Sequence, residues 1–179
     1  MILYCDFNPK IVREFNLKDE AENLIETSKI YPSGHGIYMS LFAKKLGIDS
    51  EVFMLKGNKR GREIAMSLSQ LGIDVNFTGL KDENVEEVLI KSKDSKKVYR
   101  TEDPRITMED RSDILNSFER SLYNKKIVVI PKIDLKGLND NIYEKLVKIC
   151  YQNKVKVAVN PRNLDEMEKI NPYILMFDK

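Results

Sequence analysis

Short apolar segments alternate with segments of helical periodicity along most of the chain, and this alternation restricts the folds that are open to it. The apolar segments begin at residues 1, 50, 125, 155 and 173 and read MILYCDF, SEVFML, KKIVVIP, VKVAVNP and YILMF. Their length and apolar character predict buried strands. Because helical segments separate them, we expect a mainly parallel sheet with helices packed on its faces, which is an α/β fold.

The segments between the strands show helical patterns. The first predicted helix carries Ile37, Leu41, Phe42 and Leu46 on one face, has Ser33 as a candidate N-cap and ends at Gly47. Further helices are predicted up to Gly72 and over residues 107–124, 139–153 and 163–170.

Two regions, 10–31 and 75–102, contain strands that alternate polar and apolar residues and do not fit a buried core. They predict a small separate sheet that serves as a lid or an interface flap. Within the second region, EEVLIKSK and KKVYRTE are expected to pair as a hairpin. Residues 1–179 are expected to form one domain, with the lid strands inserted into the α/β core.

Composition narrows the class of protein. Of the 179 residues 42% are hydrophobic and 32% charged, which is typical of a soluble globular protein, and the formal net charge is only +2. Without a basic stripe, neither nucleic acid nor an acidic membrane is an expected partner. We find no apolar run near the roughly 20 residues of a membrane span and no signal-peptide pattern, so a cytoplasmic location is expected. Cys5 and Cys150 are interpreted as buried free thiols, with a disulfide left open.

A short glycine-bearing turn, PSGHG at residues 32–36, leads into the first predicted helix. One interpretation is a residual anion site formed by the amides of Gly34 and Gly36 with His35, since helix N-termini attract negative charge. The other is a helix start kept for packing. His35 is the only histidine, so we predict no catalytic residue and no metal ligand.

Several motifs follow one another in a recognisable order: DFNPKIV, PSGHGIYMS, VFMLKGNKRG and IVVIPKIDL. They resemble L-N-P-A-I-D, A-G-G-K-G-I-N-V-A, the G-F-L-G-G stretch and V-V-L-S-G-S-L-P of the PfkB (ribokinase-like) carbohydrate kinases, particularly the 1-phosphofructokinase and tagatose-6-phosphate kinase branch. The resemblance covers the whole chain. It implies a ribokinase-like, partial three-layer α/β/α fold with a mainly parallel sheet and a small β lid.

The resemblance also implies positions for a vestigial substrate site, which are Asn8, Gly34, His35, Gly36, Tyr38 and Gly57. Val12 stands where relatives have the aspartate that binds sugar hydroxyls, His35 replaces the lysine that meets the phosphate, and Tyr38 replaces a sugar-binding asparagine. Glu86 and Glu87 lie near the family's phosphate-binding arginine and are expected to repel a phosphate. The S-G-S turn is replaced by residues that include Lys132.

Two further features near residue 60 leave alternatives open. Gly57 and Gly61 either bring a sugar close to the backbone, as the family's glycines do, or supply positive φ angles in a turn. The basic cluster at Lys56, Lys59, Arg60 and Arg62 either meets a phosphate or is solvated.

Relatives use ATP and magnesium, and the resemblance implies a second half of the sheet with a G-A-G-D aspartate, which has no counterpart in this sequence. We therefore expect no cofactor on this chain alone, and a truncated, degenerate homologue that is inactive by itself or binds a sugar phosphate weakly. The relatives phosphorylate ketohexose phosphates such as fructose 1-phosphate.

Two alternatives stay open: the substrate-binding half of a split kinase, and a non-catalytic protein that binds an intact kinase through its lid strands. A homo-oligomer or a partner chain is expected, through the lid strands or the open sheet edge.

Overall fold

The larger sheet is parallel throughout, as the buried segments predict. The computed structural model describes residues 1–19, 24–138 and 141–177. This sheet contains β1 (Ile2–Asp6), β4 (Ser50–Lys56), β5 (Asp74–Gly79), β8 (Ile127–Ile130), β9 (Lys156–Val159) and β10 (Ile174–Leu175). The strands lie in the order β10-β9-β8-β1-β4-β5, and each neighbouring pair is parallel. The expected strand at residues 173–177 is shorter than predicted, because β10 is an edge strand that pairs only with β9 among the described residues.

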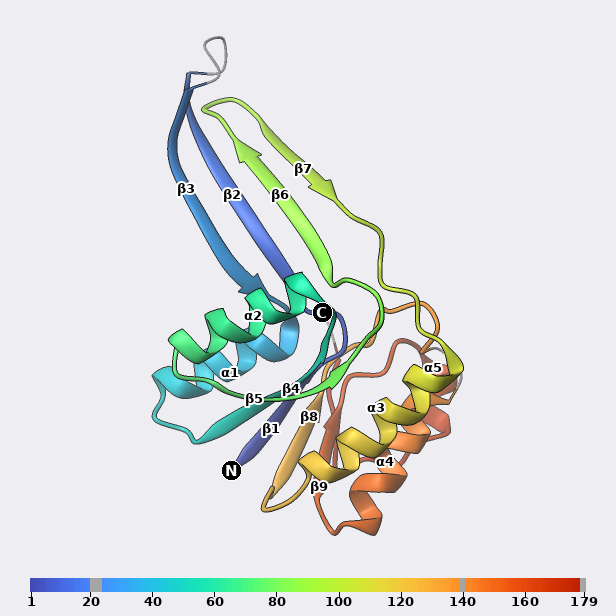
Figure 1. Cartoon of the computed structure of the whole chain (residues 1–179). Helices are drawn as coiled ribbons and strands as arrows, with labels where there is room; N and C mark the ends of the chain where they lie inside the picture. Colours follow the sequence, from blue (N-terminus) through green and yellow to red (C-terminus); the bar gives the residue numbers. More distant parts are fainter. Residues whose placement is uncertain (20–23, 139–140, 178–179) are drawn as a thin grey trace.

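Helices cover both faces of this sheet (Figure 1). They are α1 (His35–Lys45), α2 (Lys59–Gln70), α3 (Met108–Ser121), α4 (Ile142–Gln152) and α5 (Leu164–Glu168). The first two pack on one face and α3 with α4 on the other, which confirms the layered α/β prediction. The predicted start of the fourth helix, at residues 139–140, lies outside the described residues. None of the described helices is long and apolar enough to cross a membrane.

A second, smaller sheet projects from the main body (Figure 1). It consists of β2 (Lys10–Asp19), β3 (Leu24–Ser33), β6 (Val85–Lys91) and β7 (Lys96–Arg100), in the order β3-β2-β6-β7. The β6–β7 hairpin is confirmed. The predicted start of the second lid region, at residue 75, is wrong, because residues 74–79 form β5 of the larger sheet. As an edge strand, β5 keeps much of its surface exposed, and this produces the polar alternation that misled the prediction.

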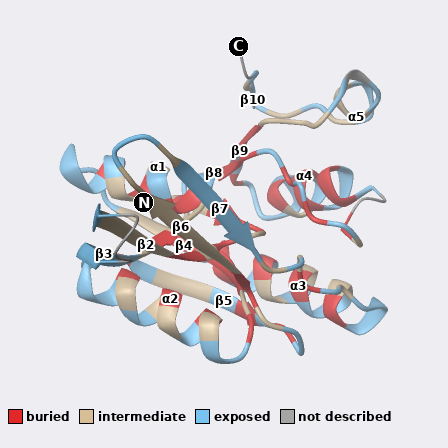
Figure 2. Ribbon diagram, turned by 90° about the horizontal axis from the view of Figure 1, so that it is seen from above, coloured by how far each residue is buried: buried red, intermediate tan, exposed pale blue. Residues whose placement is uncertain are grey.

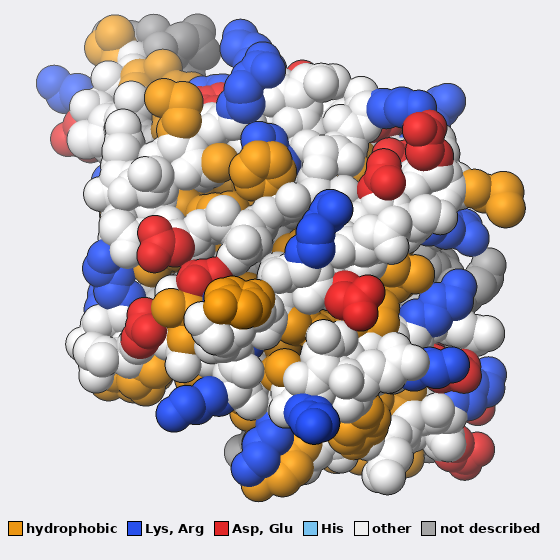
Figure 3. Space-filling model, turned by 60° about the horizontal axis from the view of Figure 1, so that its bottom comes forward, with side chains coloured by type: hydrophobic (Ala, Val, Ile, Leu, Met, Phe, Trp, Pro, Cys, Tyr) orange, Lys and Arg blue, Asp and Glu red, His pale blue; other side chains and the backbone are white. Residues whose placement is uncertain are grey.

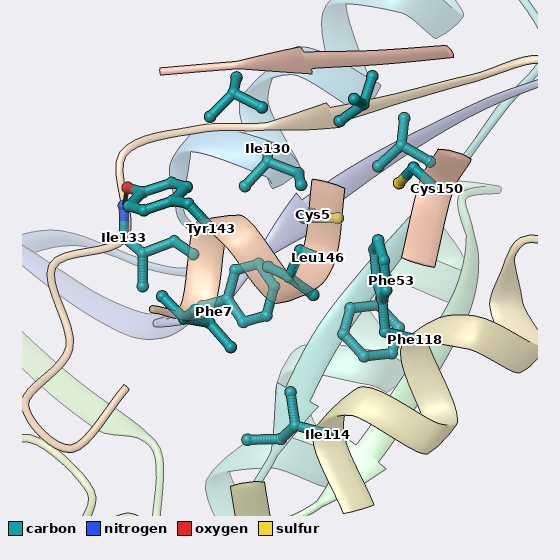
Figure 4. Close-up of a cluster of buried hydrophobic side chains, with 14 of the residues drawn as sticks. Cys5, Phe7, Phe53, Ile114, Phe118, Ile130, Ile133, Tyr143, Leu146 and Cys150 are labelled. Carbon is teal, nitrogen blue, oxygen red and sulfur yellow. Dashed lines mark hydrogen bonds between the residues drawn. The ribbon is translucent and has the colours of Figure 1, made fainter. Parts of the chain in front are cut away.

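The core is divided by the larger sheet into two layers, visible as the buried residues between sheet and helices in Figure 2. In the layer beneath α3 and α4, the ring of Phe53 makes edge-to-face contacts with Phe7 and Phe118, at centroid distances of 6.0 and 5.6 Å (Figure 4). Cys5 and Cys150 lie in the same layer as free, buried thiols, and burial raises the pKa of Cys150 to about 12. Both are packing residues.

A single buried amide joins the two sheets. Asn84, which is 1% exposed and directly precedes β6, accepts a hydrogen bond from the Gly57 N–H at 2.6 Å. Its Nδ2 donates to the carbonyl oxygens of Leu55, at 3.0 Å, and Pro9, at 3.3 Å. Asn84 therefore holds the end of β4 and the segment before β2 against the start of β6.

The same junction explains Gly57. A Cβ built at this position would lie 2.4 Å from the carbonyl oxygen of Asp82, so only glycine allows the two backbones to approach. Neither Gly57 nor Gly61 has a positive φ, so the turn-geometry interpretation of these glycines is wrong.

Candidate functional site

A pocket of about 480 Å³ lies at the carboxyl ends of β1 and β8. From β1 the chain passes through α1 to β4 on one side, whereas β8 leads through α4 to β9 on the other. The strand order therefore reverses between β1 and β8, and open α/β sheets bind their ligands at such a switch point. Residues at the edge of the second sheet close the pocket, notably Lys10, Arg100 and Asp103.

The predicted site residues are only partly brought together. Those that line the pocket are Asn8, Gly34, His35 and Tyr38. Gly36 lies buried beneath them, where a Cβ would come within 2.1 Å of the Cys5 carbonyl oxygen, and Gly57 is held at the sheet junction by Asn84. The Tyr38 hydroxyl donates to Ser33 Oγ at 2.8 Å. Val12 is buried and does not line the pocket.

The start of α1 is occupied by a carboxylate of the chain itself. Asp6, the last residue of β1, is 4% exposed, and its Oδ2 accepts a hydrogen bond from the Ile37 N–H at 3.2 Å. The amides of Gly36 and Asn8 also bond to this carboxylate. A Cβ at Gly34 would lie 1.9 Å from Asp6 Oδ2, so glycine at this position makes room for the carboxylate.

This arrangement corrects one expectation and argues against another. Ser33 is not the helix cap, because the N-cap is Gly34 and no side chain caps it, while Asp6 satisfies the first turn. Within the PSGHG turn the Gly36 amide is also engaged by Asp6, so a carboxylate already lies where an external anion would approach the helix start. Two unit charges 4 Å apart repel by about 4 kcal/mol at an effective dielectric constant of 20, which disfavours a phosphate beside an ionised Asp6.

Burial changes the protonation of Asp6. Desolvation raises its pKa from 3.8 to about 6, although the hydrogen bonds from Ile37, Asn8 and Gly36 and the charge of Lys10 act in the opposite direction. The helix N-terminus thus compensates only part of the cost of the buried charge.

The start of α2 is occupied in the same way. The N–H groups of Lys59 and Arg60 each donate to one carboxylate oxygen of Glu83, at 3.0 Å. In α3, Thr107 and Asp110 form a capping box. Because side chains already satisfy these three helix starts, none of them fits the phosphates of a nucleotide. Within the basic cluster, Lys56 packs over the Phe77 ring, 3.3 Å from its centroid.

Most of the charged groups at the second sheet are paired internally. Lys10 donates to Glu87 at 2.6 Å, and the Arg100 guanidinium lies 2.5 Å from Asp103 and 3.8 Å from Glu87. Asn8 Nδ2 donates to the same Asp103 oxygen at 2.9 Å, which links β1 to the segment after β7.

Glu86 is also balanced, by two arginines. Its carboxylate pairs with Arg13 at 2.5 Å and Arg60 at 2.9 Å, and these contacts, the Arg13 hydrogen bond above all, lower its pKa. Glu86 and Glu87 therefore serve in salt bridges that hold β2, β6 and α2 together, a role that their spacing did not indicate.

The loop between β8 and α4 carries two unpaired cations. Its side chains alternate between the core and the pocket, with Ile133 and Leu135 buried and Lys132 and Lys136 exposed along the pocket wall. The loop is anchored where the Ile133 N–H donates to the Tyr143 hydroxyl at 2.6 Å (Figure 4). No acidic side chain of the described residues forms a salt bridge with either lysine.

Two site residues were missed by sequence reasoning for identifiable reasons. Asp6 ends a buried strand, where a charged residue is unusual, and that was the available signal. Lys136 lies in a loop whose alternation of buried and exposed residues was not used. Among the residues that the structure describes, no group of three or more His, Cys, Asp and Glu side chains is placed to hold a metal ion.

Comparison with known proteins supports the resemblance seen in the motifs. No family model matches the chain. It is 26% identical over 165 residues to 1-phosphofructokinase of Bacillus subtilis, which covers 89% of this chain and 53% of the relative. It is 24% identical over 181 residues to D-tagatose-1-phosphate kinase of Bacillus licheniformis, which covers 98% of this chain and 59% of the relative. The chain therefore spans little more than half the length of these curated relatives.

Solved structures share the fold over nearly the whole chain. A candidate phosphofructokinase of Staphylococcus aureus superposes with a TM-score of 0.85 at 20% identity, over 99% of this chain and 59% of its own. The tetrameric inhibited form of Escherichia coli phosphofructokinase-2 gives a TM-score of 0.80 at 14% identity. The superposition covers 98% of this chain and 60% of the phosphofructokinase-2 chain. The chain thus shares the ribokinase-like α/β fold of these phosphofructokinases over the part that it spans, and its sequence is similar to those of the two curated sugar kinases.

Proposed function

We propose that the pocket binds a small phosphorylated sugar weakly and that this chain alone does not transfer a phosphoryl group. The observation that carries the proposal is the position of the pocket, at the switch point between β1 and β8 and closed by the second sheet. Its volume of about 480 Å³ is within the range of pockets for small ligands. The curated relatives are kinases of fructose 1-phosphate and tagatose 1-phosphate, by their names.

The lining suits a polyol that carries a negative charge. Asn8 Oδ1 is buried without a hydrogen-bond partner among the described residues, and an unsatisfied buried acceptor costs about 1–3 kcal/mol. A sugar hydroxyl that reached this oxygen after a small movement of the amide would recover that cost. Ser33 and Tyr38, whose hydroxyls are hydrogen-bonded to each other, also line the pocket, and so do the cationic side chains of Lys132 and Lys136.

The proposed lack of phosphoryl transfer follows from what the reaction needs. Phosphoryl transfer depends on a positioned base and on donors that stabilise charge on the transferring group. The sequence contains neither a G-x-x-x-x-G-K-[ST] loop nor the G-A-G-D motif, and side chains of the chain itself fill the starts of α1, α2 and α3.

Ligand-dependent stability and a turnover assay test the proposal together. Fructose 1-phosphate or tagatose 6-phosphate at ten times its Kd should stabilise the chain by about 1.4 kcal/mol, whereas fructose and ATP should leave the melting temperature unchanged. A coupled assay with ATP, magnesium and either sugar phosphate should show no turnover. ATP-dependent phosphorylation by the purified chain would contradict the proposal and favour an enzyme.

We also propose that the second sheet mediates association with another copy of the chain. Apolar side chains of its edge strands are exposed, namely Leu24, Ile25 and Ile30 on β3 and Val98 and Tyr99 on β7. Exposed edge strands with apolar side chains tend to pair. On the face in Figure 3, hydrophobic side chains are interspersed with charged ones.

Sedimentation equilibrium tests the association. The chain should form a dimer at micromolar concentration, and Ile30→Lys should shift it to the monomer because a charge would be buried at the contact. Met66→Lys, which alters an equally exposed apolar residue on α2, is the matched control. A monomeric unsubstituted chain, or equal effects of the two substitutions, would count against this surface.

A further inference from the structure

Two cationic side chains in the pocket, Lys132 and Lys136, differ from Lys10 and Arg100 in having no carboxylate partner among the described residues. Lys10 pairs with Glu87, and Arg100 pairs with Asp103. Neither loop lysine forms a hydrogen bond or salt bridge with any described residue. The carboxylate of Asp134 lies between them in sequence and also lines the pocket, where its charge acts on Arg162.

The backbone holds these lysines in place. Ile133 and Leu135 are about 1% exposed and anchor the loop in the core, and the Ile133 N–H donates to the Tyr143 hydroxyl. In an extended segment alternate side chains point to the same side, so burial of Ile133 and Leu135 directs Lys132 and Lys136 to the pocket. Both lysines therefore belong to one loop segment that is anchored in the core.

Elsewhere in the pocket lining, the start of α1 presents a carboxylate. The Asp6 carboxylate accepts hydrogen bonds from the amides of Ile37 and Gly36. A residue larger than glycine at position 34 would collide with this carboxylate. His35 is exposed at the pocket next to this carboxylate. A ligand anion placed at the turn would meet the Asp6 carboxylate, whereas at the β8–α4 loop it would meet two unpaired ammonium groups.

We propose that Lys132 and Lys136 bind the phosphate group of the sugar ligand, and that Asp6 occupies the start of α1 in place of that phosphate. The assignment rests on the proposed sugar-phosphate binding. It orients the ligand with its phosphate against the β8–α4 loop and its hydroxyls toward Asn8 and the start of α1. The PSGHG turn then shapes the pocket without binding the anion.

Calorimetric titration of the full chain with fructose 1-phosphate, at fixed ionic strength and pH 7.5, tests the assignment. The double variant Lys132→Ala/Lys136→Ala should weaken binding at least tenfold, because it removes two charge-assisted contacts. Lys145→Ala/Lys148→Ala removes the same charge from exposed positions on α4 and should bind within twofold of the unsubstituted chain. His35→Ala should weaken binding less than Lys132→Ala/Lys136→Ala does, because His35 lines the pocket without holding the phosphate. Circular dichroism of each variant checks that it is folded.

The outcomes separate this assignment from the proposed function. Unchanged affinity in the Lys132/Lys136 variant, or a tenfold loss in His35→Ala, would place the phosphate elsewhere and overturn the assignment alone. Failure of the unsubstituted chain to bind fructose 1-phosphate would overturn the proposed function and the assignment with it. An equal loss in the Lys145/Lys148 control would show that overall charge, and not the loop, attracts the ligand, and would also overturn the assignment.

Discussion

Asp6→Asn is expected to abolish a rise in stability that the unsubstituted chain shows on acidification. The folded-state pKa of Asp6 is about 6, above its ordinary value of 3.8, because the carboxylate is desolvated. The folded chain therefore binds more protons than the unfolded chain between these values, and stability falls as the pH rises through 6. At low pH, protonated Asp6 contributes about 3 kcal/mol to the free energy of unfolding. About 2 kcal/mol of this contribution is lost between pH 4.5 and 7.5.

The difference in the free energy of unfolding between Asp6→Asn and the unsubstituted chain isolates the contribution of the Asp6 carboxyl group. Carboxylates with lowered pKa values, such as Glu14 and Glu86, lose their stabilising contributions at lower pH in both proteins and cancel in the difference. Urea unfolding across pH 4.5 to 7.5 should show the variant gaining about 2 kcal/mol relative to the unsubstituted chain as the pH rises. Asp134→Asn, which removes an exposed carboxylate of the same pocket, controls for the change in net charge. A pH-independent difference for Asp6→Asn would contradict the buried carboxylate.

Asn84→Leu should cause the largest loss of stability, at least about 3 kcal/mol. The substitution keeps the number and branching of the side-chain heavy atoms but leaves the Gly57 N–H and the carbonyl oxygens of Leu55 and Pro9 without partners. Each buried group left unsatisfied costs about 1–3 kcal/mol. Because these groups belong to both sheets, hydrogen exchange of the Gly57 amide should accelerate more than that of amides in the core of β1.

An exposed asparagine in the same region provides the control for Asn84. Asn58 is exposed, and its Nδ2 donates to the carbonyl oxygen of Lys81 at 2.9 Å. Asn58→Ala should cost less than about 1 kcal/mol, since water replaces that hydrogen bond. Equal losses in the two variants, measured by urea unfolding, would mean that Asn84 does not join the sheets in the way described.

The sequence predicts the fold well wherever the signal is local. Apolar runs such as SEVFML and KKIVVIP are buried on both faces of a parallel sheet, and the helical periodicity around Ile64 and Leu68 reflects a real packed face. The assignment of β5 fails because an edge strand of the larger sheet and a strand of the lid show the same half-exposed pattern. Which sheet such a strand joins is decided by long-range pairing.

The sequence predicts where the candidate site lies, but it does not predict which side chains fill the helix starts there. Asn8, His35 and Tyr38 line the pocket because motif order places the ends of β1 and the start of α1 together. The occupied helix starts could not be foreseen, since the hydrogen bonds of Asp6 to Ile37 and of Glu83 to Lys59 join residues far apart in sequence. Hydrogen bonds between residues so far apart leave no periodic pattern in the sequence.

The central claim is that a buried carboxylate of the chain itself fills the start of α1, where a free turn would bind an anion. A pH titration of the Asp6 side-chain carboxyl carbon by ¹³C NMR, on the unsubstituted chain, tests this claim most directly. The resonance should titrate with a midpoint near pH 6, raised by burial. A midpoint near the ordinary value of 3.8 would mean that the Asp6 carboxylate is solvated and that the amides at the start of α1 remain open to a ligand.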